Sequence, residues 1–106
     1  AWHGILPLAP QDFNQPVAPI HVVGPVCESG DTFARDRLLP PLGRASRIAI
    51  LDTGAYGAVM SSTYNSRPLA AQVLVENGQW TVIRRRQTLE ELWQDETMPA
   101  PPNGKA

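Results

Sequence analysis

The sequence is poor in cysteine and in long apolar runs, and neither sign of charge dominates. Its single cysteine, Cys27, among 106 residues excludes an internal disulfide framework and a zinc site built from several cysteines, and it is compatible with a reducing compartment. No apolar run approaches the roughly 18 residues that a membrane-spanning helix requires. Nine basic and ten acidic residues give a formal net charge of -1, which supplies no electrostatic footprint for nucleic acid or an anionic membrane. We therefore expect neither kind of partner.

The length and composition are those of one small folded domain. Hydrophobic residues make up 42% and charged residues 18% of the chain, a balance typical of globular rather than disordered proteins. The first residue is Ala1, with neither an initiator methionine nor a basic-then-apolar signal region. We expect the chain to be a piece of a longer protein.

Glycine and proline are frequent and break the backbone into short pieces. The 8 glycines and 11 prolines exceed average usage and disfavour a helical bundle. No segment repeats another, and helices do not alternate with strands as they do in a parallel sheet. The expected fold class is mainly β: a small β-sandwich or barrel-like domain with short helices.

Three segments show patterns typical of strands. Residues 1–8 alternate as in a half-buried strand, and residues 20–27 and 47–52 are short runs rich in apolar side chains. Pro25 interrupts the hydrogen bonding of the second segment, so an edge position or a bulge near Gly24 is expected.

Short helices are expected at three places. Asp31 or Thr32 is a candidate cap for a helical turn over residues 33–37, and the small residues of 55–63 favour a short helix. Residues 88–96 resemble a capped helix, because Thr88 is followed three positions later by Glu91. The domain is thus expected over residues 1–96, with a disordered proline-rich tail over residues 97–106.

The clearest local signal is a hairpin over residues 69–86. Asn77 and Gly78 tolerate the positive φ angles of a type I′ turn and lie between two alternating runs. The turn sets the register, with Glu76 opposite Gln79. One face of the hairpin then carries four large side chains, which we expect to form the core: Val73, Val75, Trp80 and Val82.

Two short segments combine glycine with side chains that could do chemistry. Cys27 and Glu28 lie in a turn at a strand end, where functional sites are often built. Taken alone, the cysteine is better explained as a small buried hydrophobe than as a reactive group, and the carboxylate as a cap. Tyr56 lies between Gly54 and Gly57, which allow a ligand to approach the backbone, and local packing of the phenol explains it equally well.

Other site types find little support in the sequence. Ser29 is followed by no histidine, so a serine-hydrolase triad fits poorly. His3 and His21 have no spacing that would require them to converge on a metal. The basic run 84–86 alternates faces on a strand and is followed by acidic residues, which indicates a solvated or ion-paired strand end.

The order of these motifs closely resembles the C-terminal part of the diaminopimelate decarboxylase family. The resemblance runs from residue 1 to about residue 96 and rests on three strings: GPVCESGDTFARDRLLPPL, ILDTGAYGAVMSSTYNSRPLAAQVLV and VIRRRQTLEEL. It implies a pyridoxal-phosphate-dependent lyase that converts meso-diaminopimelate into lysine and carbon dioxide. Such enzymes join an N-terminal (β/α)8 barrel to a C-terminal β domain, and this chain is similar to most of the second.

The resemblance also implies roles for single residues. Cys27 matches a cysteine that reaches the active site of the neighbouring subunit and gives a proton to the carbanion left by carbon dioxide. Glu28 matches the residue that contacts the far amino group of the substrate. Tyr56 matches a tyrosine that binds the cofactor phosphate in its own subunit and belongs to the substrate site, while Asp31 and Arg35 are given a structural role in the turn. The family implies a cytoplasmic homodimer with active sites at the subunit interface.

Parts that the family requires are absent from the chain. Its only lysine, Lys105, lies in the tail, so the Schiff-base lysine is missing, as are the phosphate-binding glycine loop and the substrate-binding arginine. We therefore expect the isolated chain to be inactive, because the cofactor supplies the electron sink. Two alternatives stay open: a non-catalytic β interaction module, and the equivalent domain of a related ornithine, arginine or carboxypolyamine decarboxylase, although Glu28 after the cysteine favours diaminopimelate.

Overall fold

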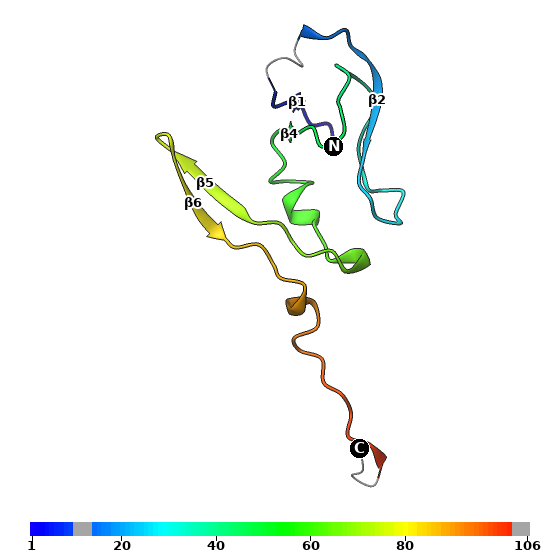
Figure 1. Cartoon of the computed structure of the whole chain (residues 1–106), viewed down its shortest axis with the longest axis vertical. Coiled ribbons are helices and arrows are strands. Elements are labelled where there is room, and N and C mark those ends of the chain that lie inside the picture. Colours follow the sequence, from blue (N-terminus) through cyan, green and yellow to red (C-terminus); the bar gives the residue numbers. More distant parts are fainter. Residues whose placement is uncertain (10–13, 103–106) are drawn as a thin grey trace. The chain divides into compact units, whose positions relative to one another are not determined.

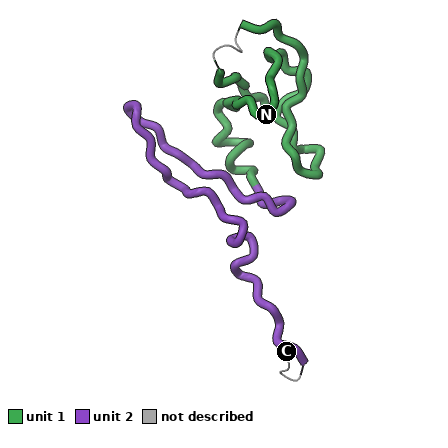
Figure 2. The backbone as a smooth tube through the Cα atoms, viewed as in Figure 1, with its two compact units in different colours: residues 1–61 green, residues 62–106 purple. Residues whose placement is uncertain are grey.

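The computed structural model describes residues 1–9 and 14–102. The chain divides into two compact units, residues 1–61 and residues 62–106 (Figure 2). The described residues form three two-stranded antiparallel sheets and short 3-10 helices (Figure 1). The expected fold class, mainly β with short helices, is confirmed.

The first sheet pairs β1 (Ile5–Pro7) with β4 (Ile48–Ile50), with Ile5 opposite Ile50. Burial alternates along residues 2–7. Buried side chains lie at His3, Ile5 and Pro7, and exposed ones lie at Trp2 and Leu6. The strand expected over residues 1–8 is therefore confirmed in a shorter form. The strand expected over residues 47–52 is also present in a shorter form, as β4, and its three residues are half-buried.

The second sheet pairs β2 (Ala18–Val23) with β3 (Thr32–Leu39). The helical turn expected over residues 33–37 is wrong, because the whole segment lies in β3. Pairing with β2 outweighs the local capping signal.

The pairing of β2 with β3 is irregular. Its register shifts twice, between Ile20 and Val22 and again between Val22 and Val23. Asp36 has φ 50°, and its N–H donates to Nδ1 of His21 at 3.0 Å. The expected irregularity is thus real but precedes Gly24.

The core of the first unit is small. It consists of Ile5, Ala34 and Leu39, each less than one-tenth exposed, so each of the two sheets contributes to it. Four partly buried residues pack against this cluster: Ile20, Val22, Ile48 and Ile50.

The hairpin of the second unit has the register expected from its turn. β5 (Gln72–Glu76) pairs with β6 (Gln79–Arg84), with Glu76 opposite Gln79, Val75 opposite Trp80 and Val73 opposite Val82. Asn77 has φ 51° and Gly78 φ 74°, as the type I′ turn requires. Local turn chemistry therefore sets this pairing.

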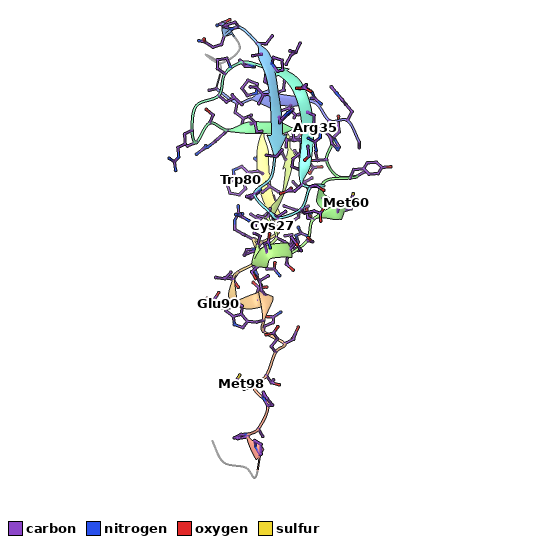
Figure 3. All side chains as sticks on the ribbon, turned by 90° about the vertical axis from the view of Figure 1, so that its right-hand side faces the viewer. Cys27, Arg35, Met60, Trp80, Glu90 and Met98 are labelled. Carbon is purple, nitrogen blue, oxygen red and sulfur yellow. The ribbon has the colours of Figure 1, made fainter. Side chains whose placement is uncertain are left out.

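The expected core face of the hairpin is exposed, so that expectation is wrong for the described residues. Val75 and Trp80 are 69% and 70% exposed, and Val73 and Val82 are about half exposed. Figure 3 shows Trp80 projecting away from the strand. A two-stranded hairpin has no second layer of its own to cover its apolar face. The alternation of apolar and polar residues predicts which side chains share a face, but it does not predict what covers that face.

The remaining expected helices are single turns. Within residues 55–63 the helix is η2 (Ala58–Met60), and η3 (Tyr64–Ser66) follows it. The helix expected over residues 88–96 is shortened to η4 (Glu90–Leu92). Glu91 nevertheless accepts hydrogen bonds from the N–H and the hydroxyl of Thr88, each at 3.0 Å, so half of the expected capping box is present.

The last described residues, 93–102, are exposed. Met98 is 92% exposed, and Figure 3 shows it on an extended segment. Lys105 lies outside the described residues. Among residues 1–9 and 14–102, no helix is long and apolar enough to cross a membrane.

Candidate active site

Cys27, which is labelled in Figure 3, lies in a tight turn between β2 and β3. The Gly24 N–H donates to the Asp31 carbonyl at 2.8 Å, and the Asp31 N–H donates to the Glu28 carbonyl at 3.0 Å. A further bond from the Glu28 N–H to the Val26 carbonyl, at 2.8 Å, closes a three-residue turn around Cys27. The thiol is exposed at the surface, so the expectation of a small buried hydrophobe does not hold in this chain.

Asp31 holds this turn through its side chain as well. Its Oδ2 accepts a hydrogen bond from the Val26 N–H at 3.1 Å, next to the residue that carries the thiol. The structural role expected of Asp31 is confirmed. Arg35 lies on β3 and is exposed, and nothing observed tests the same role for Arg35.

The Glu28 carboxylate folds over its own turn. Its Oε1 accepts from the Gly30 N–H at 3.1 Å and faces the Ser29 hydroxyl at 3.5 Å. The side chain is exposed, and its second oxygen has no partner among the described residues. The carboxylate therefore caps the turn and keeps an oxygen with which to bind a cation from outside.

Tyr56 lies at the apex of a second turn, which follows β4. Its φ is 62°, the left-handed region that non-glycine residues rarely adopt, and its side chain is 67% exposed. The Ala58 N–H donates to the Thr53 carbonyl at 2.6 Å, and the Val59 N–H donates to the Gly54 carbonyl at 3.3 Å. These two bonds close the turn and present the phenol outward.

The glycines beside Tyr56 differ in what they allow. A Cβ built on Gly57 would lie 2.6 Å from both Cβ and the carbonyl oxygen of Thr53, whereas nothing lies within 4 Å of a Cβ on Gly54. Gly57 is thus required by packing within the chain. Open space for an approaching ligand remains only at Gly54.

This set of side chains fits a small part of a pyridoxal phosphate site. A phenol donates a hydrogen bond to a phosphate without adding charge, and the exposed Tyr56 is free to do so. The Cys27 turn connects β2 to β3, whereas the Tyr56 turn follows β4. A lysine for the Schiff base is not among the described residues.

His3 is a buried polar residue whose role sequence reasoning missed. It is 6% exposed, and its Nδ1 lies 3.1 Å from the Leu51 carbonyl oxygen. The alternation of residues 1–8 placed His3 on one side of a strand but could not indicate a partner 48 positions away. Within residues 1–9 and 14–102, no three His, Cys, Asp or Glu side chains gather as metal ligands would.

The basic strand end in the second unit is ion-paired, as the sequence indicated. Arg85 forms a two-pronged ion pair with Glu91, and the Arg85 Nη2 lies 2.9 Å from Oε2. The hydrogen bond from Arg85, followed by that from the Thr88 N–H, lowers the pKa of Glu91 to about 2. Glu91 and Arg85 in turn line a shallow depression with Leu69, Arg84 and Gln87.

Comparison with known proteins decides the family. Residues 1–54 match a family described as the C-terminal sheet domain of pyridoxal-dependent decarboxylases. The chain belongs to this family. The resemblance seen in the sequence is thereby confirmed for the sheet domain, and the match includes both Cys27 and Glu28 but ends before Tyr56.

Two relatives of this sheet domain are named diaminopimelate decarboxylase. The chain is 45% identical over 100 residues to the diaminopimelate decarboxylase of Methanothermobacter thermautotrophicus, covering 94% of this chain and 23% of that protein. It is 51% identical over 86 residues to that of Escherichia coli K12, covering 74% of this chain and 20% of that protein. The chain thus spans about a quarter of the length of the curated relatives it matches.

Solved structures show the same likeness. The diaminopimelate decarboxylase of Helicobacter pylori complexed with L-lysine matches with a TM-score of 0.78 at 46% identity, over 89% of this chain and 23% of that one. The enzyme of M. jannaschii in co-complex with L-lysine matches with a TM-score of 0.82 at 33% identity, over 93% of this chain and 22% of that one. The sheet domain is therefore similar in fold to one part of these longer proteins.

Proposed function

We propose that this chain is the C-terminal part of a diaminopimelate decarboxylase, which converts meso-2,6-diaminopimelate to L-lysine and carbon dioxide in lysine biosynthesis. The observation that carries the proposal is the match to relatives of that name over 94% of the chain at 45% identity. Two matched structures hold L-lysine, the product of that reaction. In this proposal residues 1–96 belong to the β domain and residues 97–106 form a tail outside it.

The exposed turns supply side chains suited to this chemistry. Pyridoxal phosphate, when bound, supplies the electron sink for loss of the carboxylate. The Cys27 Sγ delivers a proton to the substrate carbon after carbon dioxide has left. Glu28 pairs with the distal ammonium of the substrate through a carboxylate oxygen, and Tyr56 donates its hydroxyl to the cofactor phosphate and borders the substrate.

The active sites are shared across a cytoplasmic homodimer in this proposal. Cys27 and Glu28 reach the partner's site, whereas Tyr56 serves its own. Support comes from the placement of the residues: Cys27 and Tyr56 lie in different turns of the first unit, and both are exposed.

The substrate assignment is tested on the complete protein loaded with pyridoxal phosphate. We expect release of carbon dioxide from meso-diaminopimelate, with equimolar L-lysine. Release from ornithine, arginine or a carboxypolyamine instead would assign the chain to a related decarboxylase. Absence of release from all of these, with cofactor bound, would leave the non-catalytic interaction module, which the exposed apolar face of β5 and β6 also suits.

The shared site is tested by mixing subunits. A Cys27→Ala subunit combined with a subunit that lacks the Schiff-base lysine forms one intact site per heterodimer. We expect each parent dimer to be nearly inactive and the mixture to regain activity. Heterodimers that form without any recovery would place all these groups in the site of one chain.

A further inference from the structure

His3 links two segments of the first unit through its imidazole. A carbonyl oxygen only accepts hydrogen bonds, so the contact of 3.1 Å to Leu51 requires that Nδ1 carries the proton. The Leu51 N–H donates in return to the Gly4 carbonyl at 2.8 Å. These two bonds extend the pairing of β1 and β4 past the Ile5–Ile50 pair.

The environment of Nε2, the second nitrogen of the imidazole, indicates why a histidine occupies position 3. With Nδ1 the only protonated nitrogen, Nε2 is an acceptor, and it is buried with no hydrogen-bond partner within residues 1–9 and 14–102. A buried acceptor without a partner is unfavourable, and an apolar side chain of similar shape would avoid that cost. Packing alone therefore does not account for a histidine here, whereas the hydrogen bond from Nδ1 does.

The segment that His3 holds leads directly into the turn of Tyr56. Leu51 is followed by Asp52 with φ 56°, and the Thr53 hydroxyl donates back to the Ile50 carbonyl at 3.4 Å. Tyr56 itself has φ 62°. Residues in this backbone region persist only where their surroundings hold them, so the turn depends on a firm start at residue 51.

We propose that His3 is a positioning residue for Tyr56. By donating from Nδ1 to the Leu51 carbonyl, it sets the point from which the chain turns to present the phenol. The consequence for the cofactor rests on the proposed function of Tyr56. The consequence for the turn itself does not.

Two substitutions separate the two nitrogens of the imidazole. In Asn the amide nitrogen lies two bonds beyond Cβ, as Nδ1 does in histidine, so His3→Asn keeps a donor for the Leu51 carbonyl. In Gln the amide lies one bond further, close to the place of Nε2, so His3→Gln loses that donor. His21→Gln is the matched control, because the His21 imidazole accepts its hydrogen bond from the Asp36 N–H at the β2–β3 bulge.

The variants are compared in the complete protein by three measurements. Hydrogen exchange of residues 52–60 reports the turn, through the Ala58 and Val59 amides that close it. Fluorescence titration gives the Kd of pyridoxal phosphate, and thermal melting gives the overall stability. We expect His3→Gln to exchange about three to ten times faster in residues 52–60 and to bind the cofactor that much more weakly. His3→Asn and His21→Gln should stay within about two-fold of the unaltered protein.

The possible results distinguish a failure of the positioning role of His3 from a failure of the proposed cofactor role of Tyr56. Equal losses in His3→Asn and His3→Gln, each in proportion to the loss of Tm, would overturn the proposal, since packing would then explain them. Faster exchange in His3→Gln alone, with cofactor affinity unchanged, would support the positioning of the turn and contradict the role of Tyr56. The 15N shifts of the His3 imidazole in the unaltered protein add a test without substitution, because a ring that carries a proton on Nε2 and none on Nδ1 would overturn the proposal.

Discussion

Asp31 fills the space beside Gly24. A Cβ built on Gly24 would clash with the Asp31 Oδ2, the same oxygen that accepts from the Val26 N–H at 3.1 Å. The turn that carries Cys27 therefore needs two things together: a missing side chain at position 24 and a carboxylate at position 31.

Substituting Gly24 by Ala should destabilise this turn. The new methyl group forces the Asp31 carboxylate away from the Val26 N–H, which combines steric strain with a lost hydrogen bond. We expect the free energy of unfolding of the complete protein to fall by about 1–3 kcal/mol, measured by urea denaturation. Gly54→Ala is the matched control, because nothing lies within 4 Å of a Cβ there. An equal loss in both variants would show that Asp31 moves aside freely.

The ion pair of Arg85 and Glu91 should give a local dependence on pH. The Arg85 hydrogen bond lowers the pKa of Glu91 to about 2, so the pKa is lower in the folded than in the unfolded protein. A group of this kind stabilises the fold above its unfolded pKa, and the contribution is lost as the pH falls through about 2. Because the pair is open to solvent, salt should weaken the effect.

A carbon-detected NMR titration of the Glu91 carboxyl checks this directly. We expect a midpoint of about 2 in the unaltered protein and a higher midpoint in Arg85→Gln. Arg86→Gln should not change the midpoint, because only the Arg86 backbone carbonyl takes part, accepting from Arg85 at 3.2 Å. A midpoint that is the same with and without Arg85 would contradict the assigned cause.

Local signals in the sequence predicted the parts of the fold that depend on neighbouring residues. Asn77 and Gly78 are sufficient to favour a type I′ turn, so the register of β5 and β6 could be predicted without knowledge of any distant contact. Thr32 and the residues after it carry an equally local signal for a helical turn, yet they pair with β2. A helical turn of five residues is marginal by itself, and the longer-range ladder prevailed.

Long-range contacts explain what the sequence did not reveal about the site. The Asp31 role was expected because the residue lies in the same turn as Cys27. The His3 hydrogen bond was missed, because nothing in the spacing relates residue 3 to residue 51. The exposed face of Val75 and Trp80 was missed for the same reason, since alternation does not indicate whether a covering layer belongs to this chain.

Tyr56→Phe should weaken cofactor binding while leaving the turn intact. The change removes only the hydroxyl, and the backbone bonds that close the turn are unaffected. A hydrogen bond to a charged phosphate contributes about 1.5–3 kcal/mol, so the Kd of pyridoxal phosphate in the complete protein should rise by about one to two powers of ten. Tyr64→Phe is the matched control, because Tyr64 is also exposed but begins η3. Unchanged affinity in Tyr56→Phe would return Tyr56 to a purely structural role.

Glu28→Asp should impair turnover of diaminopimelate without affecting folding. An aspartate accepts readily from the N–H two residues onward, so the bond to Gly30 and the turn survive the change. The carboxylate is withdrawn by one methylene, however, and a misplacement of about 1 Å can cost on the order of 100-fold in rate. We expect kcat/KM of the complete enzyme to fall at least about ten-fold, with Tm and cofactor content unchanged.

Two further variants show whether reach and charge both matter at this position. Glu28→Gln keeps the length of the side chain and an acceptor for the Gly30 N–H but removes the charge that pairs with the distal ammonium. It should therefore lose turnover as well, and the loss should appear mainly in KM. Glu76→Asp at the end of β5 is the matched control for shortening an exposed glutamate and should leave kcat/KM unchanged. Near-normal efficiency in both Glu28 variants would mean that the carboxylate only caps its own turn, since the bond to Gly30 at 3.1 Å would then account for all that Glu28 does.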